Sequence, residues 1–152
     1  MTTSFDRQRQ WYSQGWFPAK WKHHPELFKR VYQQRRWRPT GKQCYRNAQR
    51  LVIDVVALAR LNSEPVPDIQ YAEGVVISLI PFCHAWVQLD GVDVEVTLDE
   101  PPAILSSHLY SHDDVLANLK SQRCYAAVDE NKLIDGINEA FTPKVNKKEG
   151  TR

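Results

Sequence analysis

The chain has 152 residues, 42% hydrophobic and 25% charged, so we expect one domain over 1–152 that buries its core without disulfide help. The cysteines are odd in number and lack paired spacing, which argues against a disulfide framework and favours a reducing compartment. Residues 1–10 are polar and charges interrupt the apolar run 51–61, so we expect neither a secretory signal nor contact with a membrane.

Charge is distributed unevenly along the chain, although the net charge is only +2. Residues 1–50 contain 12 basic and two acidic residues, a net charge of +10, and residues 51–152 contain eight basic and 16 acidic residues, a net charge of −8. Such asymmetry can mark contact with nucleic acid or with an acidic partner. The alternative, which we favour, is that these charges form a solvated helix face that covers the acidic C-terminal half.

Two helices are predicted in the first half. Residues 1–21 are rich in aromatic side chains without a clean period, and we expect an irregular arm packed on the domain. Pro25 can open a helix whose apolar residues recur at helical spacing until Pro39 disfavours helix at the residue before it. The second helix starts at Cys44, which is on its inward side, and ends at Asn62. Its polar residues are expected mostly on other faces: Arg46, Gln49, Arg50 and Asp54.

The second half predicts a small sheet followed by helices. Residues 69–79 are typical of a strand, and 83–89 and 92–97 flank Asp90-Gly91, the strongest short signal for a hairpin. We expect a loop over 99–110, helices over 113–124 and 129–141, and a flexible tail over 142–152. The fold class is therefore α+β, with the N-terminal helices packed on a small antiparallel sheet.

The hairpin brings a histidine close to a carboxylate. If Asp90-Gly91 is a two-residue loop, Trp86 is opposite Glu95 and His84 is opposite Thr97, with all four side chains on one face. Glu95 is then the diagonal neighbour of His84, within reach of a long side chain. A carboxylate in this position orients the ring and fixes its tautomer.

Cys44 is at a helix start, where the positive end of the helix favours a thiolate. With Cys44 as nucleophile, His84 as base and Glu95 as the group that orients the base, a possible catalytic set is complete. The thiolate of Cys44 would attack an amide or thioester carbonyl, and the His84 imidazolium would protonate the leaving amine. Glu95 would steady the ring. The free backbone N–H of Cys44 could donate to the oxyanion.

Four short motifs occur in one order: Gly41-Lys42-Gln43-Cys44-Tyr45-Arg46-Asn47-Ala48, Tyr71-Ala72-Glu73-Gly74, His84-Ala85-Trp86 and Glu95-Val96-Thr97. In these motifs and in their order, the chain resembles the short phage and bacterial proteins of the transglutaminase-like/papain-like superfamily. The resemblance covers roughly residues 40–100 and implies Cys44 as nucleophile, His84 as base and Glu95 as third member. It also implies a papain/transglutaminase-like core. The expected lack of a signal and of a membrane span predicts a cytoplasmic location, which the resemblance assigns to a bacterial cell or a phage-infected host. Many relatives have Asp-Pro-Thr where this chain has Glu-Val-Thr.

Four residues are candidates for substrate binding, and each has a structural alternative. Asn47 could contact substrate or make a local hydrogen bond, and Trp86 could be a substrate platform or part of the sheet core. Tyr71 and Glu73 could line the site, and Glu73 could equally pair with an arginine. Cys83 precedes His84, so alternation places its side chain on the opposite face, in the core.

Three classes of function remain at this point. The first is acyl transfer on a protein or peptide-like substrate, as peptidase, deamidase or transglutaminase, with no cofactor. The second is a non-catalytic protein that binds a host protein or, less favoured, nucleic acid through its basic N-terminal region, where 35–38 mixes cations with Trp37. The third is structural zinc, which the ligand spacing disfavours. Its possible ligands are Cys44, Cys83, His84, Cys124 and the His23-His24 pair.

Overall fold

The computed structural model describes residues 24–142. The predicted aromatic arm is outside the described residues, as is the predicted tail from residue 143 onward. Within the described part, the element order is two helices, two long strands, a short strand, an edge strand and two helices. The prediction of an α+β fold with an antiparallel sheet is confirmed.

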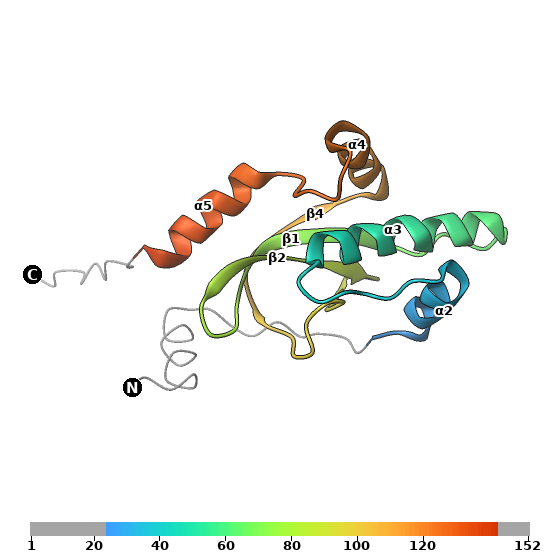
Figure 1. Cartoon of the computed structure of the whole chain (residues 1–152), viewed down its shortest axis with the longest axis horizontal. Helices are drawn as coiled ribbons and strands as arrows, with labels where there is room; N and C mark the ends of the chain where they lie inside the picture. Colours follow the sequence, from blue (N-terminus) through green and yellow to red (C-terminus); the bar gives the residue numbers. More distant parts are fainter. Residues whose placement is uncertain (1–23, 143–152) are drawn as a thin grey trace, which may run out of the picture.

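The two N-terminal helices form where the periodicity predicts them. Helix α2 (Glu26–Arg35) has Pro25 at its N-cap and ends at Arg36, whose left-handed backbone has φ 56°. Helix α3 (Cys44–Leu61) lies against the sheet, and α2 packs on α3 (Figure 1). Apolar residues of α3, such as Leu51 and Val55, are fully buried against the strands.

The polar residues of α3 were expected mostly on faces other than the apolar one, but Gln49 and Asp54 are buried as well, at 0% and 4% exposed. Asp54 is covered because α2 packs beside it, where it accepts hydrogen bonds from Arg35 Nε at 3.2 Å and Trp37 Nε1 at 2.8 Å. Gln49 is covered on the other side, where its Nε2 donates to the carbonyl of Ala126 at 2.7 Å. Helix α3 is therefore buried on three sides.

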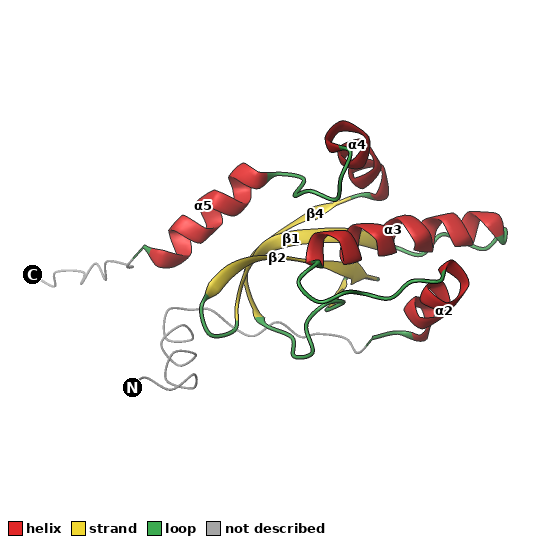
Figure 2. Cartoon of the chain, viewed as in Figure 1, coloured by secondary structure: helices red, strands yellow, loops and turns green. Residues whose placement is uncertain are grey.

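The sheet is antiparallel, with strand order β3-β2-β1-β4. Strand β1 (Ile69–Ile77) is central and pairs with β2 (Pro81–Leu89) and with β4 (Ala103–Tyr110). Gly74 is needed in β1 because a Cβ there would overlap the backbone of Ser106 in β4. Figure 2 shows α3 running alongside the strands, and it contacts β1 and β2.

The predicted loop over 99–110 is wrong, because 103–110 forms β4. This strand is at the sheet edge and is only partly buried, and its sequence contains Ser106, Ser107 and His108. A half-exposed polar edge strand has little hydrophobic alternation. Its strand character comes from pairing with β1, which is distant in sequence.

The predicted hairpin is confirmed at its turn. Asp90 and Gly91 both have positive φ, 51° and 77°, as a type I′ turn requires, and Leu89 pairs with Val92. Strand β3 (Val92–Val94) is shorter than predicted, so the chain leaves the ladder before it reaches residues 95–97.

The C-terminal helices agree with the sequence pattern. Helix α4 (His112–Gln122) begins with a capping box in which Ser111 and Asp114 exchange side-chain and backbone hydrogen bonds. Helix α5 (Glu130–Phe141) is capped by Asp129 and packs on β1 and β2. Among the described residues, no helix is both long and apolar enough to cross a membrane.

Candidate active site

Cys44 is the first residue of α3 and is half-buried, in contact with the core cluster between α3 and the sheet. The N-cap residue Gln43 makes no side-chain hydrogen bond to the helix. As the first helical residue, Cys44 has an amide that no carbonyl of its own helix can reach. A donor and the positive end of an 18-residue helix are therefore available beside the sulfur.

His84 is on β2 and is only 2% exposed. Its ring lies between two aromatic residues of the same strand face, with Phe82 in an edge contact at 5.7 Å and Trp86 stacked at 6.1 Å between centroids. Packing on both sides limits rotation of the imidazole, so the ring is held in one orientation.

Glu95 meets His84 as predicted, but by a different route. Nε2 of His84 lies 2.9 Å from Oε1 and 2.8 Å from Oε2 of Glu95. Oε1 also accepts the backbone N–H groups of Thr97 and Leu98, each at 2.9 Å. These backbone bonds turn the chain away from β2, which ends the ladder at Val94 and leaves no Glu95–Trp86 or Thr97–His84 strand pair.

The charge state of His84 depends on both partners. Burial acts to lower the pKa of His84, but hydrogen bonding to Cys44 and Glu95, together with their negative charge, outweighs burial and raises it to about 9. Cys44 and Glu95 therefore both favour the protonated form of the His84 imidazole.

The predicted substrate residue Asn47 is buried, and all of its contacts are internal. Its side chain accepts from the Thr40 amide and donates to the Thr40 carbonyl at 2.8 Å and to Thr97 Oγ1 at 2.9 Å. Asn47 thus ties the loop before Cys44 to the segment after Glu95. This is the local hydrogen bonding that we expected as the alternative to substrate contact.

Trp86 is fully buried in a second cluster, with Ala72 and Val76, on the sheet face opposite the main core. Its Nε1 donates to Asp93 at 2.9 Å. The position agrees with the alternative that Trp86 belongs to the sheet core. A direct contact with substrate would require the indole to move.

Tyr71 and Glu73 are both 0% exposed and interact with each other, with the tyrosine hydroxyl donating to Glu73 Oε2 at 2.6 Å. Glu73 also accepts the backbone N–H groups of Val128 at 2.9 Å and Asp129 at 2.7 Å. We call these four residues the Glu73 clamp. Glu73 therefore pairs with backbone amides and a tyrosine, and the clamp fixes the linker between α4 and α5.

The other two cysteines occupy different environments. Cys83 points away from His84, as predicted, and its sulfur is 3.9 Å from the carbonyl of Leu133 in α5. It is only partly buried and belongs to neither core cluster, so the prediction that it lies in the core is wrong. Burial, with a smaller contribution from Cys44, raises the pKa of the Cys83 thiol. Cys124 is exposed.

An open depression of about 430 Å³ lies beside the start of α3. It is lined by residues on either side of Cys44 and by the α4–α5 linker, namely Lys42, Gln43, Tyr45, Arg46, Cys124 and Tyr125. Cys44 itself is not among the residues that line this depression.

Three contributors to the site were not expected from the sequence: Phe82, which packs on His84, and the backbone amides of Thr97 and Leu98. Phe82 shares a strand face with His84 by alternation, so the strand pattern contained that signal. The amides had no comparable signal, because they depend on where β3 ends.

Comparison with models of known protein families, with curated proteins and with solved structures gives no match. Within residues 24–142, no three His, Cys, Asp or Glu side chains form a group that could hold a metal ion.

Proposed function

We propose that this chain is a cysteine-dependent acyl-transfer enzyme that acts on an amide-type substrate through Cys44, His84 and Glu95. The observation that supports it best is the environment of His84. This buried ring is bound by Glu95 at 2.8 Å and interacts with the Cys44 side chain, and its pKa is raised to about 9. A protonated imidazole beside a sulfur is the arrangement that stabilises a reactive thiolate.

The chemistry follows from these three side chains. The Cys44 sulfur attacks the carbonyl carbon of an amide, the C–N bond breaks, and His84 gives its proton to the leaving nitrogen. The product of this step is a thioester on Cys44. Water or an amine then attacks the thioester, His84 accepts a proton from it, and the thiolate is restored. Glu95 does not exchange protons in this scheme and acts by holding the imidazolium.

Peptide cleavage, glutamine deamidation and transglutamination share this first step and differ in the leaving group and the acceptor. The arrangement of elements supports the scheme. The helix that begins at Cys44 packs against the antiparallel sheet (Figure 1). His84 is on strand β2 of that sheet, and Glu95 directly follows the last residue of strand β3. This arrangement is compatible with a papain/transglutaminase-like core.

The chain contains its own controls for a test of the nucleophile. Limiting iodoacetamide at pH 6 to 7, followed by peptide mass analysis, should modify Cys44 at least about tenfold faster than the exposed Cys124, because only Cys44 has an imidazolium partner. Cys83 should react slowest, because burial raises its pKa. Cys44→Ala should remove the fast phase and Cys124→Ala should not. Equal rates and equal pH dependence at Cys44 and Cys124 would sink the proposal.

Intact-mass analysis with a panel of glutamine peptides and activated esters then tests acyl transfer itself. A thioester adduct that is absent in Cys44→Ala would identify both the nucleophile and the class of substrate.

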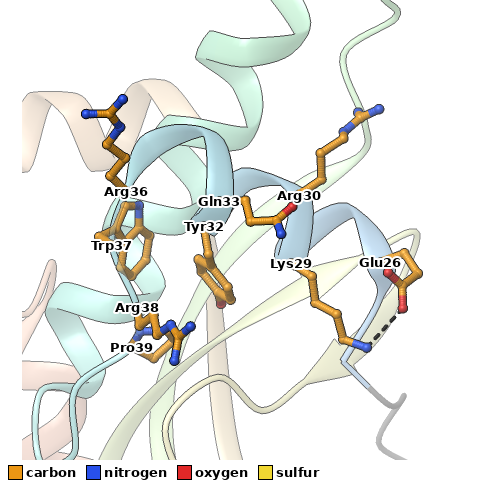
Figure 3. Close-up of a pocket in the computed structure, with 9 residues that line it drawn as sticks. All are labelled: Glu26, Lys29, Arg30, Tyr32, Gln33, Arg36, Trp37, Arg38 and Pro39. Atoms are coloured by element: carbon orange, nitrogen blue, oxygen red, sulfur yellow. Dashed lines mark hydrogen bonds and ion pairs between the residues drawn. The ribbon is translucent and has the colours of Figure 1, made fainter.

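A protein that binds a partner without catalysis is the second candidate, and one observation favours it. An open pocket of about 870 Å³ beside α2 is lined by four cations, Lys29, Arg30, Arg36 and Arg38, and by one acid, Glu26, which pairs with Lys29 (Figure 3). If Cys44→Ala retains full biological activity, the binding function replaces the catalytic one.

A further inference from the structure

A long stretch of the chain around Cys44 is rich in cations and has no acid. Residues 27–53 contain eight Lys or Arg and no Asp or Glu. Four of these eight cations have acidic partners: Lys29 with Glu26, Arg30 with Glu64, and Arg35 and Arg50 with Asp54.

The other four cations are Arg36, Arg38, Lys42 and Arg46, which we call the basic track. All four are exposed, and none forms an ion pair with an acid in the described part of the chain. Their positive charge is therefore available to an anionic partner.

The cations of the basic track line two separate open pockets. Arg36 and Arg38 extend from either side of Trp37 in the pocket beside α2 (Figure 3). Lys42 and Arg46 line the depression beside the start of α3. The track thus leads along the chain from the α2 pocket to the two sides of Cys44.

The backbone beneath the track is fixed. Trp37 Nε1 donates to Asp54 at 2.8 Å, and Asn47 bonds to both backbone groups of Thr40. Arg36 and Lys42 both have left-handed backbones, with φ of 56° and 64°. A rigid surface orders few groups when it binds a ligand, which lowers the entropic cost of binding.

The aromatic contacts favour an acidic peptide over a nucleic acid. Sequence-independent binders of single strands stack bases on exposed aromatic faces. The Trp37 ring already has Arg50 at 4.6 Å over it and Tyr32 in an edge contact at 4.9 Å. At the α2 pocket the aromatic ring beside the track cations is therefore already in contact with other side chains, which suits carboxylates on an extended polypeptide better than stacked bases. Two tyrosines, Tyr45 and Tyr125, line the second pocket, so this preference for a peptide comes from the α2 pocket.

We propose that the basic track is the docking surface for an acidic segment of the polypeptide substrate, which it guides to Cys44. This inference rests on the proposed function for its catalytic outcome, but the docking itself is independent of it. The substrate class is then a protein or peptide with Glu or Asp residues flanking the reacting amide.

Binding is tested first, on the full chain with Cys44→Ala to prevent turnover. The probe is a fluorescent peptide of about twelve residues, long enough to follow the track, with a central Gln flanked by alternating Glu. The comparison probes are the same peptide with Lys for Glu, and an oligothymidylate of equal length. Fluorescence anisotropy at low and high salt should show that the acidic peptide binds at least about tenfold more tightly than the Lys peptide, with the difference lost at high salt.

Charge-reversal variants locate the surface. Arg36→Glu/Arg38→Glu and Lys42→Glu/Arg46→Glu should each weaken binding of the acidic peptide by about tenfold. The control is Arg60→Glu/Lys120→Glu, which changes the net charge equally at exposed positions outside the track and should have little effect. Circular dichroism should show the same fold for all three variants.

Several outcomes would overturn the docking proposal. They are equal binding of the acidic and Lys peptides, equal losses in the control variant, or track-dependent binding of oligothymidylate alone. The last would identify a nucleic-acid surface.

A second measurement with active Cys44 separates the two proposals. Intact-mass analysis of thioester formation should favour the acidic peptide over the Lys peptide. Track-dependent binding without any thioester would leave the docking surface in place and reject the proposed function. Thioester formation at equal rates with the acidic and the Lys peptide would support the proposed function and reject the docking surface.

Discussion

Glu73 and Glu95 are both buried carboxylates that accept two backbone N–H groups and contact one side chain. The side-chain partner differs. Glu95 contacts His84, which can be charged, whereas Glu73 contacts Tyr71, whose pKa burial and the Glu73 charge raise well above 10. Only the Glu95 pair can therefore hold a cation beside the sulfur of Cys44, and the Glu73 clamp is limited to holding the α4–α5 linker.

The distribution of bonds over the carboxylate oxygens also differs. Both backbone bonds to Glu95 fall on Oε1. Those to Glu73 are divided, with Asp129 on Oε1 and Val128 on Oε2. A glutamine has one acceptor oxygen, so it can retain the backbone bonds at position 95 but not at position 73.

Glu73→Gln is expected to have the largest effect in this comparison. The new side-chain NH₂ group would face a buried backbone N–H, so two hydrogen-bond donors would meet with no acceptor between them. The free energy of unfolding should therefore fall by about 3 kcal/mol. Urea unfolding measures this. The pH dependence of Cys44 alkylation should not change in the folded variant, and a change there would mean that Glu73 also acts on the reactive site.

Glu95→Gln should instead affect the chemistry. Without the carboxylate charge, the pKa of His84 should fall from about 9, and acyl transfer at Cys44 should slow by about a hundredfold. NMR titration of the His84 ring and the rate of Cys44 alkylation against pH measure the two effects. A loss of stability as large as that of Glu73→Gln, with the His84 titration unmoved, would contradict the division of roles.

The His84–Glu95 pair should also make stability depend on pH. Because the folded-state pKa of about 9 is above the ordinary 6.5, the stabilisation is complete below pH 6.5 and is lost as pH rises through 9. We expect the free energy of unfolding to fall by on the order of 1 to 3 kcal/mol across this window. Urea unfolding at a series of pH values measures the slope, which should flatten in Glu95→Gln. Stability that rose over this pH range would contradict the assigned charge state.

Tyr71→Phe should have the smallest effect. It removes one of three hydrogen bonds to Glu73 and leaves both backbone bonds, so it should cost about 1 kcal/mol. Thermal unfolding measures the loss, and the pH dependence expected for His84 should persist in this variant. A cost equal to that of Glu73→Gln would show that the hydroxyl, and not the backbone pairing, holds the clamp.

The sequence by itself determined the elements that local chemistry encodes. Helix α3 follows from the spacing of its apolar residues, and the hairpin follows from Asp90-Gly91, where the left-handed backbone is cheapest. The approach of Glu95 to His84 was predicted from that turn and is confirmed. These features depend on residues close together in the chain, so a local pattern is sufficient.

Only the tertiary structure decided the features that depend on distant pairing. Strand β4 exists because β1 offers it a free edge, and Gln49 and Asp54 are buried because other segments pack over α3. The Glu73 clamp joins β1 to backbone amides more than 50 positions away, and backbone amides leave no mark in a sequence pattern. The local pattern therefore specified the three side chains of the candidate site, and long-range packing specified how they are held.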